Sequence, residues 1–305
     1  MQNLVSICIP AYKRTIFLKR LLDSIATQIY KNFEVIVTDD SPDDDVKQLC
    51  DLYTNQFTLF YYRNIKQLGT PENWNEAIRK SNTPWIKIMH DDDWFTDEKS
   101  LHEFINAIEK NPSSSFIFSA YKNVFINENK TKDIFINTFR YNMLCKKPVT
   151  LFSENSIGPP SCVIFKKNNI LFDNKFQWVV DFDFYIRYLL SAKPFYIKKV
   201  LINIGISDTQ VTQQSFRKPE IEIPENFLLL QKVGSAQLKN ILVFDAWWRL
   251  IRNLKIKNIA YIKSFGYNGD VPEKIISIIN FQNKIPSSIL NIGIVSKLLM
   301  LICFL

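Results

Sequence analysis

Three consecutive carboxylates, Asp91, Asp92 and Asp93, follow the apolar run at residues 85–89. Like charges placed together at the end of a strand repel one another unless a cation neutralises them. Mg²⁺ and Mn²⁺ bind carboxylate oxygens together with the phosphates of a substrate, so the run predicts a divalent-metal site. Because side chains alternate along an extended chain, Asp91 and Asp93 would point one way and Asp92 the other. A solvated acidic turn is the alternative interpretation.

Strands and helices alternate in the part of the chain that must position these carboxylates. Apolar runs predict strands at residues 5–9, 33–38, 59–62, 85–89, 115–119, 162–165 and 195–204. Apolar residues at helical spacing predict helices at residues 17–25, 71–80, 98–109 and 182–190. Strand, helix and strand in succession form a βαβ unit, which implies a parallel sheet. The sequence therefore predicts an α/β fold with a Rossmann-like, mainly parallel sheet flanked by helices. Residues 123–149 show no regular pattern.

Polar residues follow three of the expected strands, at residues 10–14, 39–41 and 91–93. Ligands of parallel sheets bind outside the carboxyl ends of the strands, so these segments are expected to form one site. The chain has only seven glycines and contains neither of the common glycine-rich phosphate loops. We therefore expect a metal, rather than a glycine loop, to hold phosphate groups.

Composition limits the classes of partner. Lys and Arg number 38 against 30 Asp and Glu, which favours anionic partners such as a nucleotide or a phospholipid surface. No zinc-finger spacing, RNP-like aromatic motif or dense arginine stripe is present, so nucleic acid is not an expected partner. The five cysteines are far apart, and the N-terminus shows no signal peptide. These features favour reduced, mostly buried thiols in a cytoplasmic protein.

After about residue 220 the sequence predicts helices, at residues 226–233, at 236–263 and in the apolar end. The segment 289–305 is short and is interrupted by Asn291 and Lys297, so it is not expected to span a membrane. Aromatic and basic residues on these helices fit peripheral contact with an anionic surface such as the inner face of the plasma membrane. Packing on the α/β domain, or on a second copy in a homodimer, explains the same pattern.

Four short motifs occur in one order along the chain: VSICIPAYKR at 5–14, FEVIVTDDS at 33–41, HDDDW at 90–94 and DFD at 181–183. Together they resemble the family 2 glycosyltransferases with the GT-A fold, over residues 3–205. The resemblance implies an inverting, hexosyltransferase-like enzyme that uses Mn²⁺ or Mg²⁺. It would move a sugar from a UDP- or dTDP-sugar to a hydroxyl of a glycan or lipid-linked acceptor. The expected setting is bacterial surface polysaccharide synthesis, such as O-antigen, capsule or lipopolysaccharide.

The resemblance also implies a division of the chain and a donor site. Residues 1–220 would form the catalytic domain and residues 221–305 a helical extension. The end of the first strand would bind the nucleotide through Pro10, Tyr12 and Arg14, with Tyr12 stacking on the base. Asp40, with Asp39 as the alternative, would accept a hydrogen bond from the N3–H of uracil or thymine. A surface position for Tyr12 and a helix-capping role for Asp40 are the alternative interpretations.

The acidic run would then be the metal and ribose site. Asp93 is the first choice for direct metal contact, and Asp92 for the ribose or the metal. His90 stands where the family commonly has an aspartate, so Asp91 could supply the missing carboxylate to the metal or the donor. A lone His90 is more simply interpreted as a neutral residue at a strand end.

Asp181 matches the family's catalytic base. A sugar hydroxyl is a poor nucleophile, so a carboxylate must take its proton as it attacks the anomeric carbon. Asp183 is the alternative base or an acceptor contact, and Trp178 is expected to shape the acceptor pocket. Helix capping by Asp181 and a core position for Trp178 are the alternatives. Relatives often carry a histidine near residues 205–210; this chain has none, and Asp208 could replace it in a loop that closes on the donor.

Other enzyme classes fit less well. A sugar nucleotidyltransferase usually has a glycine-rich loop with a basic residue after its first strand, and none follows Ile9. A Mg²⁺ phosphohydrolase with an aspartate nucleophile would need threonine where Phe95 stands. A non-catalytic protein that binds a nucleotide or glycan is compatible with the fold, although carboxylates stand at all the expected catalytic positions.

Overall fold

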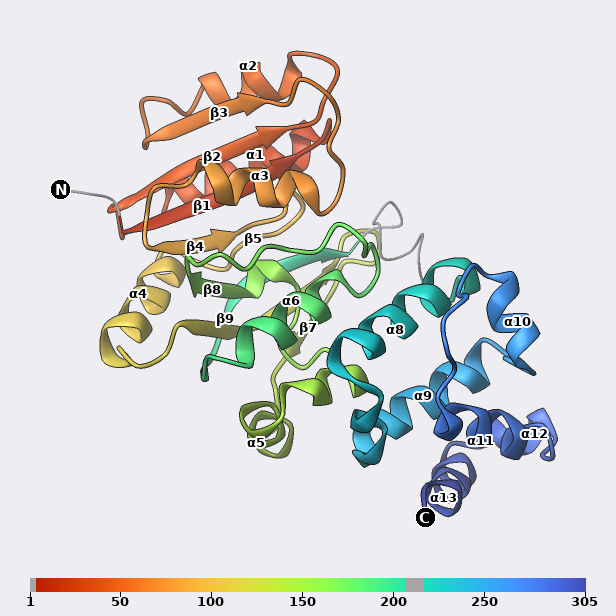
Figure 1. The fold of residues 1–305 in the computed structure, drawn as a ribbon. Coiled ribbons are helices and arrows are strands. Elements are labelled where there is room, and N and C mark those ends of the chain that lie inside the picture. The colour runs from red at the N-terminus through yellow and green to blue at the C-terminus, as the bar shows by residue number, and fades with distance from the viewer. Residues whose placement is uncertain (1–3, 207–216) are drawn as a thin grey trace.

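The computed structural model describes residues 4–206 and 217–305. Its centre is a nine-stranded sheet in the order β3-β2-β1-β4-β8-β6-β9-β5, with β7 paired to β6 (Figure 1). The strands are β1 (Val5–Ala11), β2 (Phe33–Asp39), β3 (Leu59–Arg63), β4 (Trp85–Ile88), β5 (Trp94–Phe95), β6 (Phe116–Phe125), β7 (Lys130–Ile134), β8 (Val163–Lys166) and β9 (Pro194–Ile206). Strands β3, β2, β1 and β4 are parallel, whereas β8 runs antiparallel to both β4 and β6. The expected α/β sheet is thus confirmed, with a parallel half and a mixed half.

The parallel half brings the three polar segments together. Strand β1 continues one residue beyond Pro10, and Ala11 pairs with Asp39 at the end of β2. On the other side of β1, the backbone N–H of Met89 donates to the carbonyl of Cys8 at 2.9 Å. Strands β1 and β2 are buried almost throughout, as expected for central strands covered on both faces. The loops after β1, β2 and β4 therefore meet at one edge of the sheet.

Helices cover both faces of the sheet, and each face has its own apolar core. One core contains side chains from α1 (Thr15–Ala26), α2 (Asp45–Asp51) and α4 (Ser100–Lys110). The other contains side chains from α3 (Glu72–Lys80), α5 (Thr138–Lys146) and α6 (Val180–Leu189). Short 3₁₀ segments, Pro148–Ser153 and Pro160–Cys162, lead from α5 into β8. Helix α6 follows β8 and carries Asp181 near its start.

Two elements lie in the region where the sequence showed no pattern. Strand β7 is an edge strand of mostly exposed residues, so it has no alternation of apolar and polar side chains to reveal it. Helix α5 has Leu144 as its one buried residue and is capped by Asn137, whose side chain accepts from the Arg140 N–H. The interpretation of residues 123–149 as irregular was wrong, because these elements bury too little of their own surface to leave a periodic signal.

The C-terminal helices gather at the end of the molecule opposite β3 and α2 (Figure 1). They are α8 (Pro219–Val233), α9 (Ile241–Asn253), α10 (Ile259–Ser264), α11 (Glu273–Gln282), α12 (Ser287–Leu290) and α13 (Gly293–Phe304), with a 3₁₀ turn at Ser235–Lys239. Trp247 and Trp248 lie in the centre of their shared apolar cluster. Within residues 4–206 and 217–305, no helix combines the length and apolar character needed to cross a lipid bilayer.

The single helix expected over residues 236–263 is divided into α9 and α10. Asn240 caps the start of α9 by accepting from the Leu242 N–H at 2.9 Å. Lys255 follows the end of α9 and has a positive φ of 52°. This left-handed backbone conformation interrupts an α-helix. Asn258 then caps α10 by accepting from the Tyr261 N–H at 2.8 Å. Both capping asparagines are visible in the sequence as signals of a helix start. The prediction of one continuous helix overlooked them.

Candidate functional site

The acidic run after β4 is buried. Asp91, Asp92 and Asp93 have exposed fractions of 3%, 7% and 2%. Three carboxylates removed from water in one turn require compensation by positive charge or hydrogen-bond donors. The interpretation of this run as a solvated acidic turn is therefore wrong.

Two arginines of the α1 region supply part of that compensation. Arg14 forms a bidentate ion pair with Asp91, and Nη1 of Arg14 lies 3.1 Å from Oδ2 of Asp92. Arg20 donates from Nη2 to the backbone carbonyl of Asp92 at 2.8 Å. Its guanidinium carbon lies 3.6 Å from the ring centre of Trp94. Arg14 was expected near a nucleotide and is placed on the carboxylates; Arg20 was not predicted, because its neighbours in sequence resemble an ordinary helix surface.

A possible ligand set for a cation lies beside these pairs. His90, Asp92 and Asp93 each offer one ligand atom, and these three atoms lie within 4.8 Å of one another. Nδ1 of His90 is 3.9 Å from Oδ2 of Asp93, and the buried Nε2 of His90 has no hydrogen-bond partner among the described residues. Asp91 is directed to Arg14 instead, so the structure groups His90 rather than Asp91 with Asp93.

Burial of this group favours its uncharged forms, and a divalent cation bound there would favour the charged carboxylates instead. Desolvation lowers the pKa of His90 to about 4, so the ring is neutral, as a metal ligand must be. Burial, with the charge of Asp92, raises the pKa of Asp93 well above its ordinary value. Burial also raises the pKa of Asp91, although Arg14 opposes that effect. A neutral imidazole beside crowded carboxylates fits Mn²⁺ or Mg²⁺ chemically.

A buried lysine lies behind the acidic run. Lys87 of β4 is fully buried, and its ammonium donates to the backbone carbonyl of Ser161. The hydroxyl of Ser161 accepts from the backbone N–H of His90 at 3.0 Å. Burial lowers the pKa of Lys87 to about 7. The imidazole of His90 packs on Trp74, with 4.6 Å between ring centres. The contacts with Ser161 and Trp74 fix the position of His90. Both partners are distant in sequence, so no local pattern predicts these contacts.

The two aspartates after β2 are held by backbone and side-chain donors. Asp39 is fully buried and accepts from the Tyr61 hydroxyl at 2.7 Å. Asp40 accepts from the backbone N–H groups of Leu68 and Gly69 at 3.0 and 2.8 Å. Helix α2 begins at residue 45 with Asp44 as its cap residue, so the helix-capping interpretation of Asp40 is wrong.

Tyr12 lies near these aspartates, just beyond the end of β1. Tyr12 is 40% exposed, and the ammonium of Lys13 lies 5.0 Å from its ring centre. The Asp40 backbone N–H donates to the carbonyl of Ala11 at 3.0 Å, so the loops after β1 and β2 are joined. A half-exposed ring where these two loops are joined is a suitable arrangement for stacking a planar base.

Asp181 occupies the first turn of α6. Its Oδ1 accepts from the Phe182 N–H at 3.0 Å, and its Oδ2 accepts from the Asn155 side chain at 2.7 Å. Burial raises the pKa of Asp181 to about 7, against the opposing effect of these donors. The cap residue of α6 is Val179, so Asp181 is not the helix cap. A partly accessible carboxyl with a pKa near neutrality is suited to take a proton.

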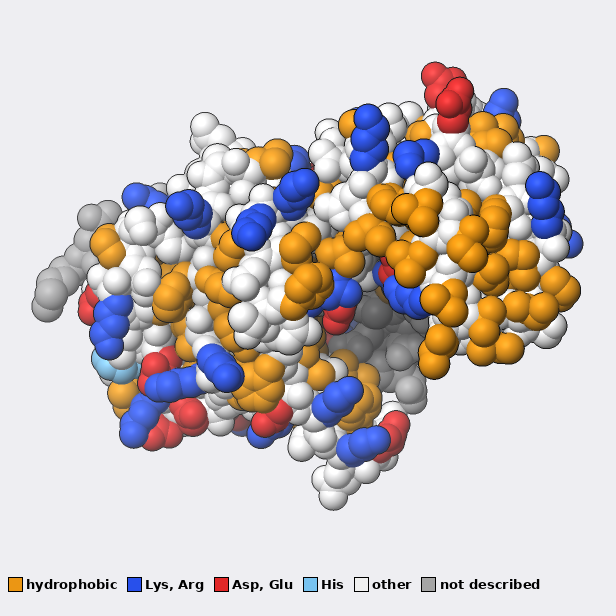
Figure 2. All heavy atoms as spheres, turned by 90° about the horizontal axis from the view of Figure 1, so that it is seen from below, with side chains coloured by type: hydrophobic (Ala, Val, Ile, Leu, Met, Phe, Trp, Pro, Cys, Tyr) orange, Lys and Arg blue, Asp and Glu red, His pale blue; other side chains and the backbone are white. Residues whose placement is uncertain are grey.

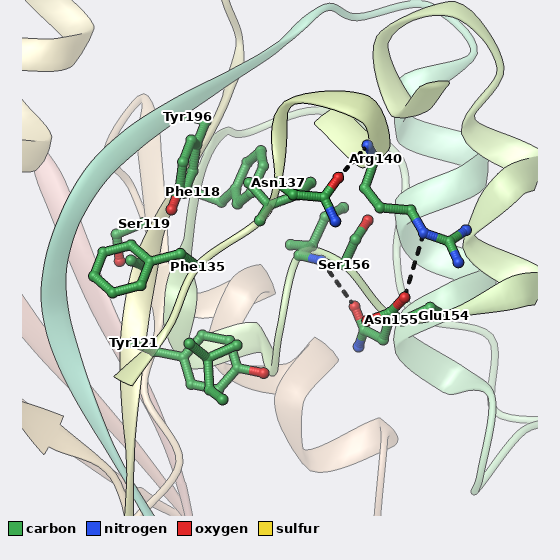
Figure 3. Close-up of a pocket in the computed structure, with 14 residues that line it drawn as sticks. Phe118, Ser119, Tyr121, Phe135, Asn137, Arg140, Glu154, Asn155, Ser156 and Tyr196 are labelled. Carbon is green, nitrogen blue, oxygen red and sulfur yellow. Dashed lines mark hydrogen bonds and ion pairs between the residues drawn. The ribbon is translucent and has the colours of Figure 1, made fainter. Parts of the chain in front are cut away.

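A cavity of about 80 Å³ adjoins Asp181 through Asn155 (Figure 3). This volume has room for several water molecules. Figure 3 shows the aromatic side chains and Ser119 on one side, and Arg140, Glu154, Asn155 and Ser156 on the other. The labelled aromatic residues are Phe118, Tyr121, Phe135 and Tyr196, and the polar residues are Ser119, Asn137, Arg140, Glu154, Asn155 and Ser156. Arg140 forms an ion pair with Glu154 at 3.4 Å. Aromatic faces with polar groups opposite them are a combination that binds small polar ligands.

The two residues expected to contact the acceptor lie elsewhere. Neither Trp178 nor Asp183 lines this cavity. Asp183 is 1% exposed and is paired with both Arg187 and Lys232, which is the arrangement of a structural ion pair between α6 and α8. Trp178 is partly buried against the core on the α6 side of the sheet. Asp208 and most of the expected closing loop lie outside the described residues.

Comparison with known proteins identifies the family of the chain. Residues 6–170 match the family model described as glycosyl transferase family 2. The chain is similar to an uncharacterized glycosyltransferase of Haemophilus influenzae, with 28% identity over 65% of this chain and 67% of that protein. It is also similar to abequosyltransferase RfbV of Salmonella typhimurium, with 32% identity over 30% of this chain and 28% of that protein.

Solved structures share the fold. Staphylococcus aureus TarS 1–349 in complex with UDP-GlcNAc aligns with a TM-score of 0.59 at 14% identity, over 92% of each chain; the chain spans 53% of a longer TarS. Mannosyltransferase PcManGT from Pyrobaculum calidifontis, in complex with GDP-Man and Mn²⁺, aligns with a TM-score of 0.56 at 13% identity, over 100% of this chain and 86% of that one. The fold is GT-A, and the chain belongs to glycosyltransferase family 2.

Proposed function

We propose that this protein is an inverting glycosyltransferase that uses a UDP- or dTDP-sugar and a hydroxyl of a glycan or lipid-linked acceptor. The observation that carries the proposal is the pair of carboxylate sites. The His90, Asp92 and Asp93 group lies at the same edge of the sheet as Asp40, whereas Asp181 lies on α6 and is hydrogen-bonded to Asn155 of the cavity. Donor activation and acceptor deprotonation require two such sites with different surroundings.

In this proposal Tyr12 stacks on the base of the donor, and Asp40 accepts from its N3–H. Asp40 already accepts from Asn64 Nδ2 and Leu68 N–H at Oδ1 and from Gly69 N–H at Oδ2, so Oδ2 keeps one acceptor site for the base. His90, Asp92 and Asp93 would hold Mn²⁺ or Mg²⁺, which when bound supplies Lewis-acid neutralisation of the departing diphosphate. Arg14 and Arg20 add positive charge at the same edge.

Asp181 takes the proton of the acceptor hydroxyl. The hydroxyl oxygen forms a bond to the anomeric carbon as the bond to the nucleoside diphosphate breaks, which inverts that carbon. The cavity beside Asn155 is the proposed place for part of the acceptor, because its polar side chains and aromatic faces suit a sugar. The setting in bacterial surface polysaccharide is supported by the similarity to an abequosyltransferase. Neighbours of the fold bind UDP-GlcNAc and GDP-Man, so the test includes several nucleotides.

The contact between Asn155 and Asp181 predicts a pH effect. A donor to the carboxylate favours its charged form, so Asn155→Ala should raise the pKa of Asp181 further above about 7. The base acts only when deprotonated, so kcat/KM should rise with pH, and in the variant this rise should move to higher pH. Release of nucleoside diphosphate, measured from pH 5.5 to pH 9, checks this.

The matched control is Asn137→Ala, which changes another amide lining the cavity, one whose oxygen accepts from the Arg140 N–H rather than contacting Asp181. Its pH profile should follow the wild type. An unshifted profile in Asn155→Ala would remove Asp181 as the group that titrates.

Helix α13 presents an apolar face to solvent (Figure 2). Ile292, Ile294, Leu298 and Ile302 are each more than half exposed. Figure 2 shows apolar side chains spread over this C-terminal end, with lysines and arginines around them. We propose that this face contacts an anionic lipid surface at the cytoplasmic side of the membrane, because apolar burial and positive charge act together there.

The test uses the triple variant I294E/L298E/I302E. It should lower sedimentation with phosphatidylglycerol vesicles by at least about 10-fold, since burial of each such side chain contributes ~1.5–3 kcal/mol. The control is Leu52→Glu, an exposed apolar residue after α2 at the other end of the molecule. Unchanged sedimentation would contradict the membrane proposal, and a dimer that the triple variant abolishes would favour self-association. Point variants are preferable to cutting after Asn283, which would also remove Ser296, the partner of Trp248.

A further inference from the structure

Helix α6, which carries Asp181, is capped from a distant part of the chain. Its cap residue, Val179, has no side chain that can accept a hydrogen bond. The carboxylate of Glu225 in α8 accepts instead from three successive backbone N–H groups. These are Gln177 to Oε1 at 2.9 Å, and Trp178 and Val179 to Oε2 at 2.8 and 3.1 Å. Glu225 is 8% exposed, so these contacts are shielded from water.

Such an arrangement is strong and specific. Hydrogen bonds from N–H groups to an ionised carboxylate are about twice as strong as neutral ones. They also involve both carboxylate oxygens, which fixes the orientation of three consecutive peptide groups. The chain turns from these peptides directly into α6, and Asp181 follows Val179 by two residues. A small displacement of this segment would therefore move the Asp181 carboxylate.

A second contact joins the same two helices. Lys232 lies on α8 seven residues after Glu225, about two turns along. Its ammonium pairs with Asp183 of α6 and, at 2.8 Å, with Asp173. Helix α8 thus holds the start of α6 at two points with opposite charges. The two contacts favour one rigid placement of α6 against α8.

We infer that Glu225 is a positioning residue for the proposed base, and that α8 is part of the catalytic unit rather than an accessory element. This inference rests on the proposed role of Asp181. It also implies that the expected division at residue 220 separates Glu225 from the site that it supports. A protein that ended before α8 would keep the metal group yet lose the orientation of Asp181.

The test compares Glu225→Ala with two control variants of α8. Glu220→Ala removes an exposed carboxylate from the same helix, and Phe227→Leu trims an apolar contact to produce a purely structural loss of stability. We expect Glu225→Ala to lower kcat by about 10–100-fold, the order of loss that misplacing a reacting group by about 1 Å produces. The donor KM and the metal-dependent thermal shift with UDP should stay within about twofold of the wild type, because the donor site lies on other elements.

Glu225→Gln keeps one of the two acceptor oxygens, so its kcat should lie between those of the wild type and Glu225→Ala. It also serves as the informative variant if Glu225→Ala does not fold. The inference is overturned if both Glu225 variants retain wild-type kcat. It is equally overturned if their kcat loss is no greater than that of Phe227→Leu at a matched melting temperature.

The Asp181→Asn variant separates failure of the inference from failure of the proposed function. Full activity in Asp181→Asn would reject the assignment of Asp181 as the base. The positioning role of Glu225 would then also be rejected, because it depends on that assignment. Loss of activity in Asp181→Asn, together with wild-type kcat in the Glu225 variants, would reject the positioning role alone.

Discussion

Replacing Asp181 with asparagine will abolish sugar transfer while donor binding persists. The amide has the shape of the carboxyl group but cannot accept the proton of the acceptor hydroxyl. General-base catalysis contributes about 10²–10⁴-fold, so kcat should fall by about that factor. Within the described residues no hydrogen bond or ion pair joins Asp181 to the donor site at the ends of β1, β2 and β4, so the thermal shift produced by UDP and Mn²⁺ should be unchanged. Rates of nucleoside diphosphate release and of product formation would measure the loss.

The companion variant is Asp183→Asn, which tests the alternative base two residues along α6. Asp183 is buried between Arg187 and Lys232, so its replacement should lower the melting temperature and leave measurable kcat at a permissive temperature. The opposite pattern, with Asp181→Asn active and Asp183→Asn inactive in a folded protein, would transfer the role to Asp183.

Replacing Asp93 with asparagine should remove metal-dependent activity. Asp93 shares the candidate ligand group with His90 and Asp92, within 4.8 Å. Loss of an outer-shell partner typically weakens metal binding 10–100-fold, and loss of a direct ligand should exceed about that range. Calorimetric titration of Mn²⁺ into the protein saturated with UDP would measure the change in affinity.

The matched control lies in the same acidic run. Asp91 is as buried as Asp93 but is paired with Arg14, so Asp91→Asn should weaken Mn²⁺ binding much less. If Asp91→Asn weakened Mn²⁺ binding more than Asp93→Asn did, the result would favour the ligand pair expected from the sequence, Asp91 with Asp93. A larger loss in His90→Ala than in Asp91→Asn would instead support the group that the structure brings together.

The sheet and its polar edge could be predicted because the central strands are buried on both faces. Strands β1, β2 and β4 are short, largely apolar runs with polar residues at or soon after their ends, and both features are local. Strand β7 and helix α5 could not be predicted in this way, because they expose most of their residues and leave no periodic pattern.

The partners of the candidate site residues were less predictable than the residues themselves. The motifs singled out Asp40, the acidic run and Asp181. They did not reveal that Arg14 pairs with Asp91, or that Glu225 holds the start of α6. Contacts of this kind join segments up to 77 residues apart, and they depend on tertiary placement rather than on local pattern. The Nε2 of His90, which has no hydrogen-bond partner within residues 4–206 and 217–305, likewise becomes visible only when the surrounding residues are in place.

The central claim is a metal-dependent nucleotide site at the edge formed by β1, β2 and β4. Thermal-shift titrations with UDP, dTDP, GDP and CDP, each with and without Mn²⁺, test it most directly. A ligand at 100 times its Kd stabilises the folded protein by about 2.7 kcal/mol, which corresponds to a rise of several degrees in melting temperature. The account predicts such a rise with UDP or dTDP when Mn²⁺ is present, and a much smaller one without it. No rise with any of the four nucleotides, with or without Mn²⁺, would contradict the account.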